Sequence, residues 1–553
     1  MSSGTANEVG KVGQEIRAGV YSDPWGEGGQ EVSGPSNFMS DRQQLLDVLW
    51  SHYRCKNYDG RKYNWHGKPN QGFVERAAIA RGGEIPAGYY DASGETMPLE
   101  MRKPLSPYYL GKAIPDRFTA MLFSTKRHPE IQCDDADTKD WLDGFAASTR
   151  LWAKLIRART FGGAMGSVGL GYKFQDGKPF VEVFDPRWAT PEFEDKSELT
   201  VKRLEVLYQY HAEVRDEDGN WVPQWYWFRR VIDEVYDTTW PKVQVLGAEE
   251  PNWANERNIS RAHGLPHCPV VWIQNMSVQD DIDGDPDCLG AYDLIESIDT
   301  LLSQANRGTT ANCDPTVAIS SDAEFESLKK GTGNALQVEK GGSIGYLEMS
   351  GAGTKQALEV AADFEEKVLT MTRCVLDRNT GGPSRTATEV EHNYSAMIDQ
   401  ADILREQYGE SGVKRLLEMV LTAAKALSQP RIVRDDVTAR IVKTTIKLPK
   451  KKVVDETTGA ATFVERVLGN GEEVDLQWPA YFTPTVEAIA AKVEAAGRAK
   501  QYGILDTEHA MAFIATDFNI TNTQALIAKI ASEEKDEAKL GLLAPPKQGF
   551  FGK

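Results

Sequence analysis

The chain has 553 residues, a formal net charge of −18 and a sequence pI of about 5.1. An acidic chain of this kind does not coat DNA through bulk attraction, because the phosphates are repelled. The six cysteines show no paired spacing, which predicts reduced thiols, and no apolar run is long enough for a signal peptide or a membrane span. We expect a chain of about three or four modules that folds in a cytoplasm.

The N-terminal half is predicted to change from helices to strands. A polar arm, residues 1–40, is expected to be disordered. Amphipathic helices follow over Asp41–His52, Leu105–Phe123 and Trp141–Phe161, with Pro115 predicted to kink or break the second. A period of two then predicts strands over Val168–Tyr172, Phe180–Phe184, Val201–Tyr210, Trp225–Val231 and Pro269–Ile273. Asp176-Gly177 and Asp218-Gly219 are typical hairpin turns.

Two helices are predicted to flank a β-rich insert in the centre of the chain. The first, Ala291–Asn306, has an apolar face that Glu296, Asp299 and Gln304 point away from. That face is formed by Leu294, Ile295, Ile298, Leu301, Leu302 and Ala305. The second, Gln356–Asp377, repeats a heptad seam through Ala361, Phe364, Val368, Met371 and Val375. The insert is predicted to hold the helix Ala323–Lys330 and strands over Thr316–Ser320, Ala335–Glu339 and Gly345–Met349. A helical hairpin in a core and a stalk that packs against copies of itself both fit this pattern.

A third helix is predicted from Thr386 to Leu427, after the loop Asn379-Thr-Gly-Gly-Pro-Ser-Arg385. Thr386 and Glu389 form a capping box, and about 42 helical residues exceed a typical globular helix. The heptad continues through Val390, Tyr394, Met397, Ala401, Leu404 and Tyr408. Gly409 and Gly412 predict a bend. Beyond it we expect a hairpin of Val437–Leu448 with Thr462–Leu468, then helices Val486–Ala496, Glu508–Ala515 and Thr523–Lys539.

Motifs that would carry chemistry are incomplete. The glycines from Gly162 to Gly171 lack the Gly-Lys-Ser/Thr of a phosphate loop and enter a strand, so structural glycines in a tight β segment are expected. The acidic loop Asp280–Asp287 fails EF-hand spacing, and a solvated loop is favoured over a cation site. His263, His267 and Cys268 lack a second ligand pair for zinc. Lys447, Lys450, Lys451 and Lys452 predict a solvated loop, with a DNA or scaffold contact as the alternative.

The order of these elements resembles the portal proteins of tailed bacteriophages. The residues that carry the resemblance are Trp272-Ile-Gln-Asn275, the acidic loop, Leu294-Ile-Glu-Ser-Ile-Asp299, and the Gly-Gly-Pro-Ser loop before Thr386-Ala-Thr-Glu389. Upstream, Phe161-Gly-Gly and Phe184-Asp-Pro-Arg187 resemble the family's β-rich wing. Downstream, Val474-Asp-Leu-Gln-Trp-Pro479 and Gly503-Ile-Leu-Asp-Thr-Glu508 resemble its C-terminal part. The resemblance covers about residues 40–540; it rests on the order of elements and on no single motif.

The resemblance implies an α+β portal fold whose parts follow one another along the chain. They are a disordered arm (1–40), a wing (41–290), stem helix 1 (291–312), a clip (313–355), stem helix 2 (356–378), a tunnel loop (379–385), a long wing helix with a β-hairpin (386–480), a helical crown (481–540) and a flexible tail (541–553). The glycine-rich insert leaves the bounds of the clip open.

The resemblance also implies roles for particular residues. The tunnel loop would face DNA through Arg378, Asn379, Thr380, Gly381, Gly382, Pro383, Ser384 and Arg385. The arginines would make weak, sequence-independent phosphate contacts or bridge neighbouring subunits. Stem contacts between subunits would involve Leu294, Ile298, Leu301, Phe364, Val368, Met371 and Val375. Docking through the clip would involve Glu324, Glu326, Lys329 and Lys330.

The function implied is that of a homo-oligomeric ring, usually of twelve copies, at one vertex of a capsid. Its partners would be double-stranded DNA, the terminase large subunit, head–tail adaptor or neck proteins, and the major capsid and scaffolding proteins. It would assemble in the host cytoplasm, need no cofactor or metal, and be no enzyme. Two alternatives stay open: a metal-dependent nuclease or hydrolase that uses the acidic loop, and another virion ring or adaptor protein. Adaptors are usually much shorter and lack this order of elements.

Overall fold

The computed structural model separates the chain into two units, Met1–Gln477 and Trp478–Lys553. The structure describes residues 40–58, 104, 106–124, 127–175, 177–197, 199–215, 221–245, 250–278, 281–313, 316–320, 343–347, 351–376, 387–428, 431–434, 441–444, 451–454, 461–464, 468, 474–481 and 486–515. The predicted arm, apart from Ser40, and the predicted last helix Thr523–Lys539 therefore lie outside the described residues. The fold is α+β, as the sequence predicts.

Among the described residues, four helices precede Ser167, where three were predicted. They are α2 (Asp41–Tyr53), α4 (Leu110–Leu122), α5 (Ala136–Thr149) and α6 (Leu151–Met165). Ser40 caps α2 through a complete capping box. The single helix predicted over Trp141–Phe161 is wrong, because Arg150 has φ 54° and ends α5 where α6 begins. Pro115 lies inside α4, in a helix that starts five residues later than predicted.

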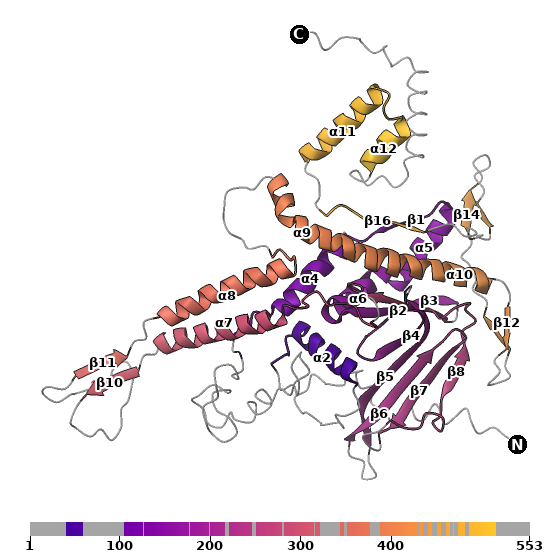
Figure 1. The fold of residues 1–553 in the computed structure, drawn as a ribbon. Helices are drawn as coiled ribbons and strands as arrows, with labels where there is room; N and C mark the ends of the chain where they lie inside the picture. Colours follow the sequence, from indigo (N-terminus) through magenta and orange to yellow (C-terminus); the bar gives the residue numbers. More distant parts are fainter. Residues whose placement is uncertain are drawn as a thin grey trace, which may run out of the picture. The chain divides into compact units, whose positions relative to one another are not determined.

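Two antiparallel sheets follow (Figure 1). The smaller has the order β3-β2-β9, with β2 (Ser167–Gln175), β3 (Lys178–Phe184) and β9 (Val270–Gln274). The larger has the order β4-β5-β6-β7-β8, with β4 (Ala189–Asp195), β5 (Thr200–Arg215), β6 (Trp221–Ile232), β7 (Tyr236–Gln244) and β8 (Ile259–Ala262). Gln175 pairs with Lys178, so β2 and β3 are joined at the predicted place, and Gly177 has φ 76°. Asp176 lies outside the described residues. The strands β4, β7 and β8 were not predicted.

The core of the first unit joins both sheets. One buried cluster contains Phe184 and Trp272 of the small sheet and Leu204 and Ile232 of the large one. On the large sheet, a second cluster is formed by Trp227, Val231, Trp240 and Val243. Helix α6 packs on β2 and β3, and its apolar residues Leu151, Leu155 and Ala158 are fully buried.

The long helix runs without a break from Ala387 to Ser428, as α9 (Ala387–Arg405), the π-helix η3 (Glu406–Lys414) and α10 (Arg415–Ser428). Met397, Ala401, Leu404 and Tyr408 are fully buried, which confirms this part of the predicted seam. Tyr394 is only partly buried, and the burial of Val390 is not described. Gly409 and Gly412 both lie in the π-helical segment, where the helix continues, and the bend predicted there stays a prediction. A Cβ on Gly412 would lie 2.6 Å from Cδ1 of Ile273, so this glycine lets η3 approach β9.

The two helices around the insert lie side by side (Figure 1), as α7 (Tyr292–Cys313) and α8 (Ala352–Met371). Between them, β10 (Thr316–Ser320) pairs with β11 (Ser343–Leu347) in an antiparallel hairpin. The first strand matches its prediction, and the second begins two residues earlier than predicted. The predicted helix Ala323–Lys330 and strand Ala335–Glu339 lie outside the described residues.

The segment after the long helix corrects one strand pairing. Two short hairpins are formed, β12 (Arg431–Arg434) with β13 (Ile441–Thr444), and β14 (Lys451–Val454) with β15 (Ala461–Val464). The predicted pairing of Val437–Leu448 with Thr462–Leu468 is therefore wrong. Strand β16 (Asp475–Gln477) pairs with β1 (Glu130–Gln132). The described helices of the second unit are α11 (Val486–Gln501) and α12 (Thr507–Ala515). Among the described residues, no helix meets the length and apolarity of a membrane span.

Candidate functional site

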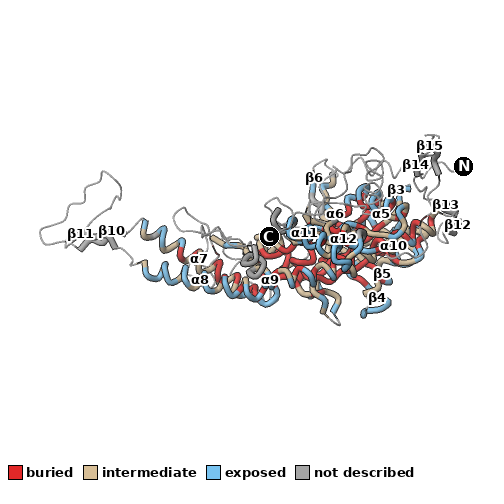
Figure 2. The backbone as a smooth tube through the Cα atoms, turned by 90° about the horizontal axis from the view of Figure 1, so that it is seen from above, coloured by how far each residue is buried: buried red, intermediate tan, exposed pale blue. Residues whose placement is uncertain are grey.

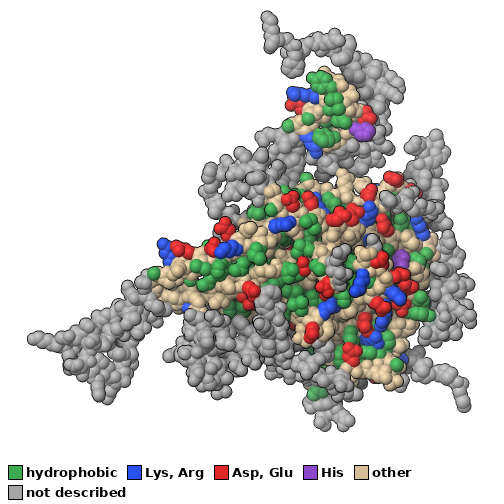
Figure 3. Space-filling model, in the orientation of Figure 1, with side chains coloured by type: hydrophobic (Ala, Val, Ile, Leu, Met, Phe, Trp, Pro, Cys, Tyr) green, Lys and Arg blue, Asp and Glu red, His purple; other side chains and the backbone are tan. Residues whose placement is uncertain are grey.

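The helix pair α7/α8 buries one side of each helix and leaves apolar side chains exposed. Ala361 and Val368 of α8 and Ile295 and Ile298 of α7 are at most 3% exposed. Helix α8 packs on α7 and makes no comparably extensive contact with another described element. Figure 2 shows exposed and partly buried residues along most of this pair. Leu358 and Met371 are 48% and 54% exposed to solvent. Figure 3 shows hydrophobic side chains gathered over α7 and α8.

The predicted stem residues therefore fall into two groups. Ile298 and Val368 are covered inside one chain, which leaves them almost no surface for a neighbouring chain. Met371 is exposed, and Leu294, Leu301, Phe364 and Val375 are partly buried. Contacts between subunits through this second group stay a prediction.

The base of α7 is held by a buried carboxylate. Asp299 is 1% exposed and accepts hydrogen bonds from the hydroxyl of Tyr58 at 2.8 Å and from the backbone N–H of Tyr108 at 2.6 Å. The Tyr108 hydroxyl in turn donates to Glu365 of α8 at 3.3 Å. Residues before α4 thus contact both helices of the pair. Asp299 is therefore as buried as the apolar residues Ile295 and Ile298, and its carboxylate is bonded within the protein.

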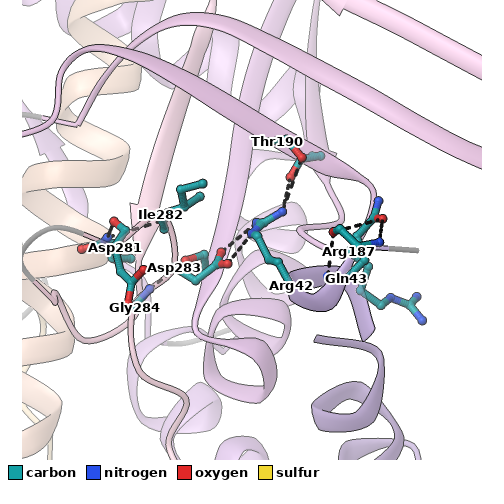
Figure 4. A network of polar contacts seen from close by, with 12 residues as sticks. Arg42, Gln43, Arg187, Thr190, Asp281, Ile282, Asp283 and Gly284 are labelled. Carbon is teal, nitrogen blue, oxygen red and sulfur yellow. Dashed lines mark hydrogen bonds and ion pairs between the residues drawn. The ribbon is translucent and has the colours of Figure 1, made fainter. Parts of the chain in front are cut away.

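The acidic loop is tied to the body by arginines, which corrects the prediction that it is solvated. Figure 4 shows Arg42 of α2 reaching Asp283, with Nε–Oδ2 and Nη2–Oδ1 distances of 2.5 and 2.9 Å. Both side chains are largely buried, at 20% and 18% exposure. Burial and the nearby Asp281 carboxylate raise the pKa of Asp285. Asp280 lies outside the described residues.

A fully buried polar network lies behind this loop. Arg159 of α6 donates from Nη2 to both carboxylate oxygens of Asp287, at 3.0 and 2.9 Å. Asn275 donates from Nδ2 to Asp287 Oδ1 at 3.0 Å and accepts from the hydroxyl of Tyr408 at 3.0 Å. The exposed fractions of Arg159, Asn275 and Tyr408 are 0%, and that of Asp287 is 7%. The network connects α6, the end of β9, the acidic loop and η3.

The network explains the glycines that resemble a phosphate loop. A Cβ on Gly162 would lie 1.7 Å from the Tyr408 hydroxyl, and one on Gly163 would lie 2.0 Å from Arg159 Nη1. Gly166 has φ 95°, and a Cβ there would lie 1.9 Å from the carbonyl oxygen of Gly284. Gly162 and Gly163 belong to α6, so their prediction as part of a β segment is wrong, whereas β2 does begin at Ser167.

Gly162→Ala is expected to lower the free energy of unfolding by about 2 kcal/mol, because overpacking a core costs about 1–3 kcal/mol. The Tyr408 hydroxyl cannot move away from the new methyl group without breaking its hydrogen bond to Asn275. Urea denaturation of the single variant, of Tyr408→Phe and of the double variant measures the coupling. The double variant should lose clearly less free energy of unfolding than the two single variants lose together, since a phenylalanine ring in place of Tyr408 would lack the clashing oxygen. Strict additivity would show that the two side chains do not meet.

The candidate zinc ligands bind other groups instead. His267 Nε2 lies 2.6 Å from the Tyr172 hydroxyl, and His263 Nε2 lies 2.9 Å from the carbonyl oxygen of Asp233. Burial lowers the pKa of His267 to about 4 and raises the pKa of the Cys268 thiol to about 12. The part of the chain that the structure describes contains no group of three or more His, Cys, Asp or Glu residues placed to hold a metal ion.

Several predicted residues cannot be placed. The tunnel-loop residues Arg378–Arg385 and the clip residues Glu324, Glu326, Lys329 and Lys330 lie outside the described residues. No role was predicted from the sequence for Arg159, and Asn275 was named only as part of a motif. No local signal marked Arg159, because the neighbouring Arg157 and Thr160 are also polar.

Comparisons with known proteins found solved structures of low similarity. They include chains of the virion of a native gene transfer agent particle (TM-score 0.31) and of the neck of an empty particle of that kind, computed with C6 symmetry (TM-score 0.32). Each is 13% identical, over 73% of this chain and 88% of the other. A TM-score near 0.3 does not by itself indicate a shared fold. No protein-family model and no curated protein matches the chain.

Proposed function

We propose that the chain is the subunit of a portal-type ring, a homo-oligomer of twelve copies at one vertex of the capsid of a tailed phage. In this proposal the ring guides double-stranded DNA during packaging and ejection. It is also the docking platform for the terminase large subunit and for neck proteins. The order of elements along the chain supports it, because the pair α7/α8 around a β-hairpin, followed by one very long helix, is the order that portal proteins have.

The observation that carries the proposal is the incomplete burial of the helix pair. Helix α8 has 20 residues, yet α7 is its one extensive neighbour among the described elements. Helices in proteins owe most of their stability to packing of an apolar face, and an isolated pair packs only one side of each helix. Leu358 and Met371 remain about half exposed. Copies of the same pair, arranged around an axis, would cover these side chains.

The charge of the chain suits a conduit. A ring of twelve copies would carry twelve times the formal charge of −18. Such a wall repels phosphates, so the duplex slides past it and is not tethered through counterion release. Arg378 and Arg385 would supply weak phosphate contacts from the tunnel loop, or ion pairs between subunits. The clip, with Glu324, Glu326, Lys329 and Lys330, would dock the packaging motor and later the neck.

Negative-stain electron microscopy of the purified full-length protein tests the proposal. The expected result is rings with a central hole, and native mass spectrometry should give one dominant oligomer near twelve copies. A monomer that stays stable at micromolar concentration would contradict the proposal. An open filament would contradict its closed symmetry.

The proposed role needs no active site, and the expectation that the chain is not an enzyme stays a prediction. A metal-dependent hydrolase would need free carboxylates in the acidic loop. Asp283 and Asp287 instead bind Arg42 and Arg159, which weakens that alternative. Nuclease assays with Mg²⁺ and Mn²⁺ would decide it, because the portal proposal expects no cleavage of DNA.

A further inference from the structure

Two carboxyl groups of α7, those of Glu296 and Asp299, are partly or fully buried near α2. Glu296 and Asp299 lie three residues apart on α7, so both point to one side of the helix. Asp299 is 1% exposed and is held by Tyr58 and by the backbone of Tyr108. Glu296 keeps 34% of its side-chain surface. The hydrogen bonds that Asp299 accepts from Tyr58 and Tyr108 come from neutral donors, so they do not neutralise two negative charges.

A buried histidine of α2 contacts Glu296. His52 Nε2 lies 3.5 Å from Glu296 Oε1, and the His52 side chain is 3% exposed. The His52 ring also packs against Tyr292 of α7, with ring centroids 4.8 Å apart. The titratable groups around Glu296 among the described residues are His52 and Tyr58 from α2 and the turn after it, Asp293 and Asp299 from α7, Tyr108 before α4, and Glu365 from α8. The nearby Lys112 of α4 is bound to Asp116 at 2.8 Å and to the Tyr53 hydroxyl at 3.4 Å.

The environment favours the neutral form of Glu296. Burial, followed by the charges of Asp293 and Asp299, raises the pKa of Glu296 from 4.5 to about 7. Burial also raises the pKa of Asp299, although hydrogen bonds from Tyr108 and Tyr58 act in the opposite direction. A charged Glu296 would therefore sit among like charges, while its neutral form packs against His52 without that cost.

We propose that Glu296 and His52 form a proton-controlled contact that fastens α7 to α2 more firmly at pH 6 than at pH 8. The contact lies at the base of the α7/α8 pair, so its strength sets how firmly that pair is seated on the body. Below neutrality Glu296 is uncharged, and α7 stays on α2. Above it, Glu296 is charged beside Asp293 and Asp299, and the repulsion loosens the helix. The inference concerns one chain and does not require the ring.

The direction of this pH effect follows from the linkage between proton binding and folding. The pKa of Glu296 is higher in the folded protein than its ordinary value, so the folded state holds the extra proton. The stabilising contribution is therefore complete below about pH 4.5 and is lost as pH rises through about 7. For these two pKa values, the equilibrium between seated and released α7 is expected to shift about tenfold towards release between pH 6 and pH 8.

Hydrogen exchange of the full-length protein, read by mass spectrometry on peptides from α7 and corrected for the intrinsic rate at each pH, measures this shift. In the wild-type protein, the protection of α7 against hydrogen exchange should fall about tenfold between pH 6 and pH 8. Glu296→Gln should keep its protection within about twofold, because it cannot ionise. The matched control is Glu366→Gln on α8, an exposed glutamate that should leave the wild-type tenfold loss unchanged.

Two results would overturn the proposal. One is equal protection of α7 at both pH values in wild type. The other is an equal loss in wild type and Glu296→Gln, which would assign the pH dependence to another group. Neither depends on whether rings form, so the same samples can be imaged to test the proposed function separately.

Discussion

Asp287→Ala is expected to lower the free energy of unfolding by about 3–5 kcal/mol, because it leaves the guanidinium of Arg159 buried without a counter-charge. Arg159 is 0% exposed and donates to both oxygens of the Asp287 carboxylate. Asn275 loses a hydrogen-bond acceptor in the same variant. Urea denaturation followed by tryptophan fluorescence measures the loss, with the midpoint moving to lower urea at an unchanged slope.

Asp283→Ala is the matched control from the same loop. Its carboxylate binds Arg42, and both side chains keep about a fifth of their surface, so water can replace the lost partner. A loss of about 1 kcal/mol is expected. Equal losses in the two variants would contradict the ranking by burial. If Asp283→Ala instead abolished a metal-stimulated cleavage of DNA, the hydrolase alternative would replace the portal proposal.

The sequence predicted elements well where the apolar period was long and uninterrupted. The seam from Met397 to Tyr408 is buried as predicted, and β10 has its predicted bounds. The hairpin of β2 and β3 lies where Asp-Gly predicted it, because glycine readily takes the positive φ that Gly177 has. In each case one local pattern was enough to determine the element.

Elements that depend on distant partners could not be predicted. Arg150 takes a left-handed conformation that arginine rarely adopts, so the break between α5 and α6 has no local signal. Strand β7 contains Pro241 and begins at Tyr236 without clear alternation, and it is defined by pairing with β6 and β8. The short β14 was placed in a loop for the same reason.

The polar network had to be missed for a related reason. The four residues of the network, Arg159, Asn275, Asp287 and Tyr408, come from separate segments of the chain. Periodicity predicts which side of one helix or strand is buried, but not which residues of different segments meet. Asp287 resembled its neighbours in an acidic loop, although it is the carboxylate that the fold removes from water. The glycines Gly162 and Gly163 were noticed, but their purpose needs the positions of Tyr408 and Arg159.

Val368→Asp is expected to cost about 3–5 kcal/mol, since it replaces a fully buried apolar side chain between α7 and α8 with a charge that has no partner there. The free energy of unfolding by urea should fall, and native mass spectrometry should show fewer complete rings. Unchanged stability together with unchanged assembly would refute the predicted seam of α8.

Met371→Asp separates contacts within one chain from contacts between chains. Met371 lies one turn further along α8 and is 54% exposed, so a charge there costs a single chain less than about 0.5 kcal/mol. If neighbouring copies cover this side chain, the variant should lose rings while its monomer keeps the wild-type unfolding midpoint. Intact rings with Met371→Asp would show that the contact between subunits lies on another face of the helix pair. A buried carboxylate without a partner is too costly to keep in an interface.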